Sequence, residues 1–286
     1  MTVKILTDSG CDLPLHFYEE NHVTFFPLKV LLNEEEYEDQ LSIKPKAIYD
    51  AIRNGQQPKT SQVSPLNFEK TFTEMAQNNE QGIYIAFSSQ LSGTYQTAAM
   101  ILEQVKENYP DFQCTIIDTK CASLGQGLVV IEAARLAVAN TSYEEIIKRT
   151  EFLASHMEHL FTVEDLDYLA KGGRVSKASA FLGGLLNIKP LLNVEDGKLV
   201  PLEKIRGKKK LLKRIIEVMA ERGVHLDQQT IGISHADDAA TAADVKKLIE
   251  EAFGAKDVLI TDIGAVIGSH TGPGTIAIFF LNTLPS

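Results

Sequence analysis

The sequence lacks the features that mark disulfide-stabilised, zinc-binding and membrane-spanning proteins. It has only three cysteines, Cys11, Cys114 and Cys121, and no two of them form a C-x-x-C pair. A disulfide framework or a structural zinc site is therefore disfavoured, and a reducing cytoplasm is the expected location. No stretch approaches the roughly eighteen apolar residues of a membrane-spanning helix, and the N-terminal MTVKILTDSG is typical of a strand and a polar loop, not of a signal peptide.

Nucleotide-binding motifs and an excess of positive charge are also missing. The sequence contains no G-x-x-x-x-G-K-[ST] loop, no G-x-G-x-x-G follows the first expected strand, and Gly125-x-Gly127 alone is a weak signal. The 28 basic residues against 38 acidic ones give a net charge of -10, which argues against general nucleic-acid binding. The composition suits a soluble protein that handles a small molecule, in one large domain or two ordinary ones.

In the first half of the chain, apolar strands alternate with helical patterns. This alternation predicts a parallel α/β sheet, in which ligands bind beyond the carboxyl ends of the strands. The loops after residues 6, 87 and 118 should therefore face one crevice. Asp12 is expected to cap a helix that begins at Pro14. The other expected strands and helices are Val3–Leu6, Val23–Leu32 with an edge or bulge at Pro27, Lys44–Arg53, 64–77, Ile83–Phe87, Tyr95–Tyr109, Cys114–Asp118, Leu128–Ala139 and Ser142–His156.

The pattern changes near residue 158, which predicts two domains, 1–157 and 158–286. Two strands joined by Glu195-Asp196-Gly197 should form a hairpin, because Asp-Gly is a strong turn signal. A glycine-rich loop is expected over Gly264–Gly274, before a buried terminal strand. The remaining expected elements are Phe161–Val163, Glu164–Ala170, Lys177–Leu186, Ile188–Val194, Lys198–Ile205, Gly207–Arg222, Thr230–Ser234, Ala239–Phe253, Val258–Ile263 and Thr275–Leu281.

The loop Ser88–Thr94 is the first candidate for a binding site. It joins the strand Ile83–Phe87 to a helix that begins near Tyr95, so unpaired N–H groups and the positive end of the helix dipole meet there. The hydroxyls of Ser92 and Thr94 would complete a site for a carboxylate or a phosphate. The alternative is that these two hydroxyls only cap the helix.

Other polar clusters have simpler interpretations. The spacing of Asp8 and Asp12 differs from the Asp-x-Asp of haloacid-dehalogenase phosphatases, and a turn with a cap explains it. A serine hydrolase built on Ser92 and His270 would lack both the G-x-S-x-G elbow and an assigned acid. The run Lys204–Arg214 places seven cations in eleven residues; it is either a solvated helix face or a docking surface for an acidic partner or phosphate.

Six motifs, in one order along almost the whole chain, resemble those of the DegV family of bacterial lipid-binding proteins. One departure is Val63, where the family often has proline. The apolar segments Phe181–Leu192 and Ile276–Leu281 are either core or the walls of an elongated pocket. The six motifs are Thr7-Asp8-Ser9…Asp12-Leu13, Thr60-Ser61-Gln62…Ser64-Pro65, Ser88-Ser89…Leu91-Ser92-Gly93-Thr94-Tyr95-Gln96, Asp118-Thr119…Ser123…Gly125…Gly127, Leu169…Gly172-Gly173-Arg174 and Gly268…His270-Thr271-Gly272-Pro273-Gly274-Thr275.

The resemblance implies a two-domain α/β fold, with an N-terminal parallel α/β sandwich, a C-terminal α/β domain with a mixed sheet, and one long-chain fatty acid buried between them. Some family members are the carrier subunit of fatty-acid kinase, in which a separate ATP-binding subunit phosphorylates the carboxylate. Carried over onto matching positions, the resemblance gives two groups of residues. The carboxylate would be held by Thr60, Ser61, Ser92, the N–H of Gly93 and His270, and the kinase or phosphate would be faced by Arg174, Arg206 and Lys208.

The expected function is therefore that of a cytoplasmic, non-enzymatic fatty-acid carrier with a kinase partner, without a metal or cofactor of its own. Donors clustered in polar loops would offset the cost of burying a carboxylate, and the tail would supply the affinity. Two alternatives stay open. One is a stand-alone hydrolase or acyltransferase that uses Ser92 and His270, and the other is a regulatory module that senses lipid.

Overall fold

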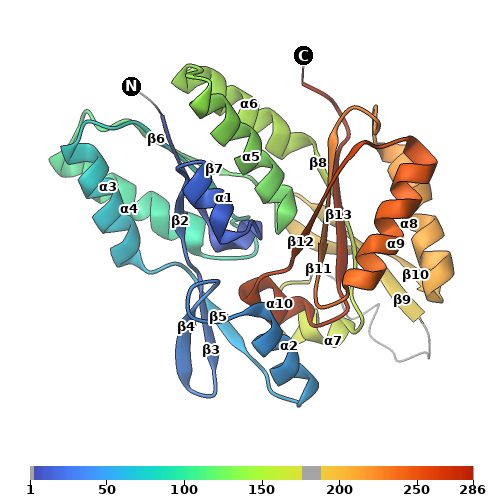
Figure 1. Cartoon of the computed structure of the whole chain (residues 1–286). Helices are drawn as coiled ribbons and strands as arrows, with labels where there is room; N and C mark the ends of the chain where they lie inside the picture. The colour runs from blue at the N-terminus through green and yellow to red at the C-terminus, as the bar shows by residue number, and fades with distance from the viewer. Residues whose placement is uncertain (1–2, 176–187, 286) are drawn as a thin grey trace.

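The computed structural model describes residues 3–175 and 188–285, and its strands form three sheets (Figure 1). The first sheet is entirely parallel, in the order β2-β1-β6-β7. A small antiparallel sheet has the order β4-β3-β5. The strands of these two sheets are β1 (Lys4–Asp8), β2 (Thr24–Phe26), β3 (Lys29–Leu32), β4 (Glu35–Glu38), β5 (Lys59–Ser61), β6 (Gly82–Ala86) and β7 (Cys114–Asp118).

The third sheet is mixed and has six strands in the order β10-β9-β8-β13-β11-β12. Only its β11–β12 pair is parallel. The α/β class, with a parallel sheet in the first half and a mixed sheet in the second, is confirmed. The strands of the mixed sheet are β8 (Met157–Thr162), β9 (Ile188–Glu195), β10 (Lys198–Arg206), β11 (Thr230–His235), β12 (Asp257–Asp262) and β13 (Ile276–Leu281).

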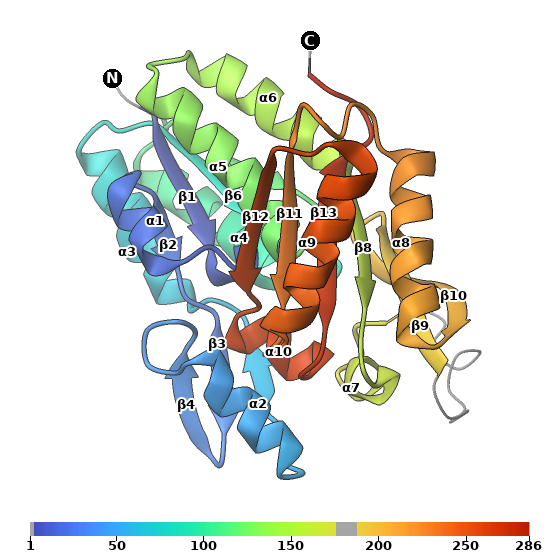
Figure 2. The same ribbon diagram turned by 45° about the vertical axis from the view of Figure 1, so that its right-hand side comes forward.

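Helices cover the two large sheets in layers (Figures 1 and 2). One face of the parallel sheet packs on α3 and α4, and the outer face of the mixed sheet packs on α8 and α9. The short helix α10 packs on β3 and β5 of the small sheet and lies against two other short helices, α2 and α7. The helices are α1 (Leu15–Glu20), α2 (Pro45–Arg53), α3 (Pro65–Gln77), α4 (Thr94–Asn108), α5 (Leu124–Val138), α6 (Tyr143–His156), α7 (Leu166–Lys171), α8 (Lys208–Arg222), α9 (Ala239–Phe253) and α10 (Ala265–Thr271).

Helix α5 lies between the parallel and mixed sheets and is buried along most of its length. Its sequence has few polar residues on any side, which is typical of a helix enclosed by protein. Two glycines let it approach its neighbours: a Cβ at Gly125 would lie 2.4 Å from the His159 ring, and one at Gly127 would lie 2.7 Å from the Cys11 carbonyl oxygen. The prediction of a loop up to residue 127 was wrong, because these glycines serve helix packing.

Proline and glycine account for the other differences between prediction and structure. The expected strand Val23–Leu32 is broken at Pro27, which has no N–H to donate, and its halves join different sheets. The expected glycine-rich loop contains α10, whose ends are capped by Gly264 and by Gly272 at φ 73°. The hairpin is confirmed, with Asp196 and Gly197 both at positive φ.

Asp12 does not cap α1, which has Pro14 at its N-cap position without a side-chain hydrogen bond. It is instead the C-cap residue of a short 3-10 helix, Ser9–Cys11. The Asp12 carboxylate instead accepts from the Gly264 N–H at 2.8 Å and from the Ser123 hydroxyl, and so holds the loop that leads into α10. The expected helix Lys177–Leu186 lies outside the described residues. The three cysteines are buried and free.

Division of the chain at residues 157 and 158 stays a prediction. The strands of the parallel and small sheets precede Met157 in the sequence, and those of the mixed sheet begin with it. The largest apolar cluster nevertheless contains residues from both parts, such as Ile85, Val129 and Phe279. Within residues 3–175 and 188–285, no helix is long and apolar enough to cross a membrane.

Candidate functional site

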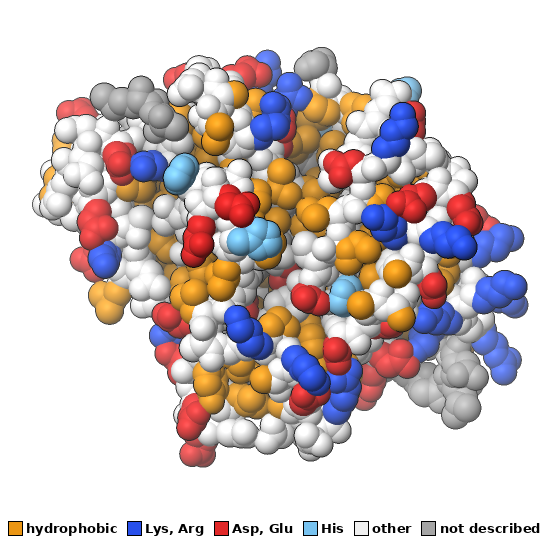
Figure 3. All heavy atoms as spheres, in the orientation of Figure 1, with side chains coloured by type: hydrophobic (Ala, Val, Ile, Leu, Met, Phe, Trp, Pro, Cys, Tyr) orange, Lys and Arg blue, Asp and Glu red, His pale blue; other side chains and the backbone are white. Residues whose placement is uncertain are grey.

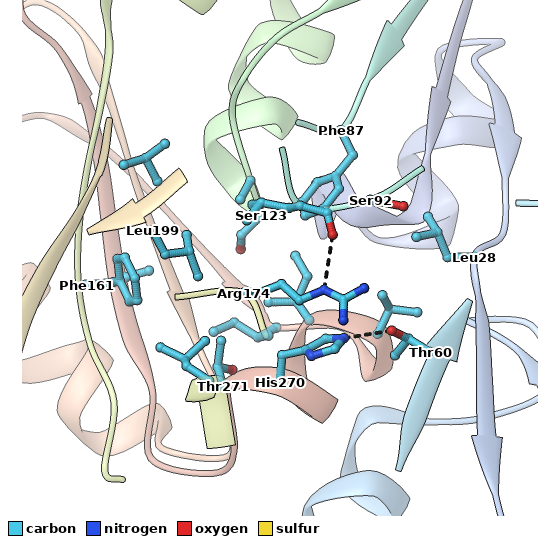
Figure 4. Close-up of a pocket in the computed structure, with 18 of the residues that line it drawn as sticks. Leu28, Thr60, Phe87, Ser92, Ser123, Phe161, Arg174, Leu199, His270 and Thr271 are labelled. Carbon is cyan, nitrogen blue, oxygen red and sulfur yellow. Dashed lines mark hydrogen bonds between the residues drawn. The ribbon is translucent and has the colours of Figure 1, made fainter. Parts of the chain in front are cut away.

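A cavity of about 360 Å³ lies between the carboxyl end of the parallel sheet and the inner face of the mixed sheet (Figure 4). Two of the three predicted loops line it, the one after β6 through Ser92 and the one after β7 through Ser123. The loop after β1 lies behind them, where Asp12 holds Ser123. The volume is within the range of about 300–1,000 Å³ that is typical of small-molecule sites.

Most of the cavity wall is apolar. Figure 4 shows Phe161 and Leu199 on the side opposite to Thr60 and His270, so the cavity has a polar end and an apolar end. Such walls favour a ligand with a long apolar part and a single polar group. The apolar lining residues are Leu28, Phe87, Leu91, Ala122, Phe161, Leu169, Val194, Leu199, Ile263, Val266, Ile267, Ala277 and Phe279.

The polar end joins segments that are far apart in the sequence. Thr60 on β5 lies 2.7 Å, Oγ1 to Nε2, from His270 at the end of α10. Ser61 and Gln62 follow Thr60 along the same edge of the cavity, and Ser61 is exposed. Gln62 donates through Nε2 to Thr97 Oγ1 at 2.6 Å, which ties this segment to α4.

The N-terminus of α4 forms another side of the polar end. Gly93 is its N-cap residue, and no side chain caps it there. Ser92 Oγ lies 2.8 Å from Thr94 Oγ1 and accepts from the Thr94 N–H at 3.3 Å. Thr94 Oγ1 also accepts from the Val63 N–H at 3.4 Å. The two hydroxyl-bearing loops predicted from the sequence are therefore hydrogen-bonded neighbours.

Arg174 also lines the polar end of the cavity. Its guanidinium donates to two backbone carbonyls, those of Leu91 at 3.2 Å and Gly172 at 2.5 Å. No acidic side chain in the described part of the chain forms an ion pair with it. Arg174 is therefore a fixed cation whose charge is available to an anionic ligand.

His270 is held in its neutral form. Burial, together with the nearby positive charge of Arg174, lowers the pKa of its imidazole to about 4. Its position is fixed by Thr60 on one side and by Gly172 on the other, where an added Cβ would lie 2.3 Å from His270 Nδ1. At neutral pH the imidazole can therefore donate one hydrogen bond without bringing a second charge to the site.

The basic run is separate from the cavity. Arg206 ends β10 and Lys208 begins α8. Both residues are exposed, and neither lines the cavity. Lys208 Nζ donates to Thr241 Oγ1 at 2.5 Å. Lysine and arginine side chains gather at the right-hand edge of Figure 3, where Figure 1 draws α8 and β10. Part of this charge is neutralised locally, since Arg214 pairs with Glu203 and Glu221 at 2.8 Å.

Sequence reasoning assigned no role to five polar residues that line the cavity, which are Gln62, Ser123, His159, Thr271 and Thr275. Ser123 bonds Asp12 and lies 2.9 Å, Oγ to Oγ, from Ser234 on β11, so it links the two halves of the chain beside the cavity. The motif match at Ser123 was a usable signal. His159 had none, because a single histidine in an apolar strand does not reveal which wall it faces.

Ser92 and His270 do not form the pair that a serine hydrolase requires. The imidazole bonds Thr60, whereas the Ser92 hydroxyl bonds Thr94. In the part of the chain that the structure describes, no carboxylate is hydrogen-bonded to His270 to orient it. Nor do the described residues contain a group of three or more His, Cys, Asp or Glu side chains placed to hold a metal ion.

Residues 2–283 match the sequence profile of the family described as "Uncharacterised protein, DegV family". A DegV domain-containing protein of Clostridium perfringens is 41% identical over 280 residues, which cover 97% of this chain and 96% of that protein. A DegV domain-containing protein of Caldanaerobacter subterraneus is 31% identical over 278 residues, which cover 97% of this chain and 98% of the relative.

Two solved structures are similar over nearly the whole chain. A DegV family protein from Thermus thermophilus, described by its fatty-acid binding, is 32% identical, with a TM-score of 0.89 and coverage of 98% of this chain and 99% of the other. DegV from Bacillus subtilis, described as a fatty-acid-binding protein, is 30% identical, with a TM-score of 0.84 and 98% coverage of both chains.

Proposed function

Because this chain belongs to the DegV family, we propose that it binds one long-chain fatty acid in the cavity between its two large sheets. The observation that carries the proposal is the polarity of the cavity: donors gather at one end, and most of the remaining wall is apolar. Solved relatives at 30–32% identity are described as binding fatty acids, which supports the same ligand class here.

In this proposal the carboxylate occupies the polar end. The hydroxyls of Thr60, Ser61 and Ser92 and the imidazole of His270 serve as donors, together with the N–H of Gly93 at the start of α4. The guanidinium of Arg174, which forms no ion pair with the other described residues, supplies the opposing charge. A hydrogen bond to a charged group contributes about 1.5–3 kcal/mol, so several donors offset the several kcal/mol that burial of a carboxylate costs.

The tail would extend toward Phe161 and Leu199. Each methylene transferred from water to this wall contributes about 0.8 kcal/mol, so the tail supplies most of the affinity. A short acid such as acetate gains only the head-group contacts and should bind weakly. The apolar wall and the polar end thus select together for an amphiphile with a small anionic head.

Denaturing extraction followed by mass spectrometry tests this proposal directly. Protein purified from a bacterial host should release fatty acid in a near-stoichiometric amount, and protein stripped of lipid should take up added long-chain fatty acid. A preparation that contains no fatty acid and takes up none would refute the proposal.

We further propose that the protein presents the carboxylate to a separate ATP-dependent kinase subunit. A surface groove of about 500 Å³ adjoins the polar end and shares Thr60, Arg174 and His270 with the cavity. Lys59 and Lys171 also line this groove, so the head-group end of the cavity is next to a basic surface. That arrangement suits entry of a phosphoryl group from outside.

In the reaction, a carboxylate oxygen of the bound lipid would attack the γ-phosphorus of ATP on the kinase subunit, and ADP would leave, giving an acyl phosphate. Arg206 and Lys208 would contact that acidic or phosphate-bearing partner. Because the partner consumes ATP, both proteins would act in the cytoplasm. Lipid-loaded protein mixed with a bacterial fatty-acid kinase subunit and ATP should give acyl phosphate; binding of lipid without phosphate transfer would instead favour a lipid sensor.

A further inference from the structure

Two side chains, His159 and Val194, line the cavity beside Phe161 and Leu199. His159 is two residues before Phe161 on β8, so both side chains face the same side of the sheet. Val194 is the register partner of Leu199 across the β9–β10 hairpin. Phe161 and Leu199 lie on the side of the cavity opposite to Thr60 (Figure 4), and β8 runs from His159 toward α7 and the polar end.

A second groove lies directly behind this wall. It has a volume of about 540 Å³ and is lined by β7, the end of α6 and the turn between β9 and β10. Among the described residues, only His159 and Val194 line both this groove and the cavity. These two side chains are therefore the partition between the cavity and a surface groove.

The His159 ring is fixed in the partition from several directions. Its Nε2 accepts from the Ala122 N–H at 3.3 Å, so Nδ1 carries the proton and donates to the Met157 carbonyl at 3.1 Å. The ring packs edge-on against Phe279, with centroids 5.3 Å apart, and Gly125 leaves no side chain to displace it. Burial lowers the pKa of this imidazole to about 4, so the wall is uncharged at neutral pH.

We propose that His159, together with Val194, is the stop that sets the longest acyl chain the cavity accepts. This inference rests on the proposed binding of a fatty acid. A tail that reaches the stop can bury no further methylene unless it coils or the head group withdraws from its donors. A smaller side chain at either position would connect the cavity to the groove behind and admit a longer tail.

The test is the affinity of the protein for a homologous series of saturated fatty acids of increasing length. In the wild type, affinity should rise by about fourfold per methylene, then level off at the length at which the tail meets the stop. In His159→Ala this break should move to longer acids, and in Val194→Ala it should move in the same direction by less. Ser155→Ala is the control, because Ser155 lines the groove but not the cavity; its break should stay at the wild-type length.

The possible outcomes separate the inference from the function on which it rests. A wild-type protein that binds none of the acids contradicts the proposed function. The wild type should show a clear break. If this break remains at the same length in His159→Ala and Val194→Ala, and circular dichroism shows that both variants are folded, the proposal that these side chains set the chain length is contradicted. If loss of the His159 hydrogen bonds prevents folding, Val194→Ala decides alone, since it leaves those bonds in place.

Discussion

Replacing Ser92 by alanine removes one hydroxyl from the polar end of the cavity. Ser92 Oγ lies 2.8 Å from Thr94 Oγ1 and accepts from the Thr94 N–H at 3.3 Å. Thr94 Oγ1 keeps its bond from the Val63 N–H in the variant. We therefore expect Ser92→Ala to fold and to bind fatty acid more weakly than the wild type.

The expected loss follows from the charge on the ligand. A hydrogen bond to an ionised group contributes about 1.5–3 kcal/mol, and each 1.4 kcal/mol changes an equilibrium constant about tenfold. The Kd for fatty acid should therefore rise by about 10- to 150-fold. The matched primary alcohol, which carries no charge, should lose less, because a neutral hydrogen bond contributes only about 1 kcal/mol.

Isothermal titration of lipid-free protein with a long-chain fatty acid and with the matched alcohol measures both losses. Ser89→Ala is the control, because it removes the same hydroxyl from the same loop. Ser89 does not line the cavity, and its Oγ donates to Asp118 Oδ2 at 2.6 Å. We expect this control to keep the affinity of the wild type for both ligands.

Two results would refute the reasoning. Equal affinity of Ser92→Ala and wild type for the fatty acid would remove Ser92 from the head-group site. Equal losses for the acid and the alcohol would show that the Ser92 hydroxyl does not contact a charged group, and that it acts by shaping the loop.

Two further perturbations address the histidines. In Gly172→Ala the new Cβ would lie 2.3 Å from His270 Nδ1, so we expect the imidazole to shift and fatty-acid affinity to fall at least tenfold. The free energy of unfolding should change by only about 1 kcal/mol. Unchanged affinity in the same titration would exclude His270 as a donor. Burial lowers the pKa of His159 to about 4, whereas the pKa of a histidine in the unfolded chain is about 6.5. Between these pH values His159 is protonated in the unfolded chain and neutral in the folded chain. The free energy of unfolding should therefore fall as pH decreases through this window. Burial raises the pKa of Asp12 and of Asp39, which has the opposite effect on the free energy of unfolding. The contribution of His159 is therefore isolated by comparing urea unfolding of His159→Gln with that of the wild type at several pH values. The two pH dependences should differ by on the order of 3 kcal/mol across this window, and identical pH dependences would contradict the prediction.

Regular elements were predictable where local pattern and structure agree. The strand Cys114–Asp118 and the helix Ala239–Phe253 lie as expected, because apolar periodicity identifies such elements without knowledge of their neighbours. Strand β5 was not predicted: Lys59–Ser61 is short and polar, and it is a strand only because β3 offers it a pairing edge. The start of α5 was missed because Gly125 and Gly127 are usual loop residues.

The candidate site divides in the same way. Ser92 and Gly93 were identified by local sequence, because a strand that leads through small polar residues into a helix is itself an anion-binding pattern. Arg174 was expected to face a partner or a phosphate, and the structure places it on both the cavity and the adjoining surface groove. A side chain's direction depends on what packs around it, which spacing along the chain does not specify.

The α/β class, the order of most elements and the loop that begins α4 were predictable, because these depend on periodicity, turn residues and charge within a few positions of one another. That Thr60 meets His270 across 210 positions, and that His159 lines both the cavity and the groove behind it, depends on the tertiary structure. Thr60 and His270 meet where α10 packs on β5, and His159 lies where β8 packs on α5. Such long-range packing leaves no local signal at the residues that it brings together.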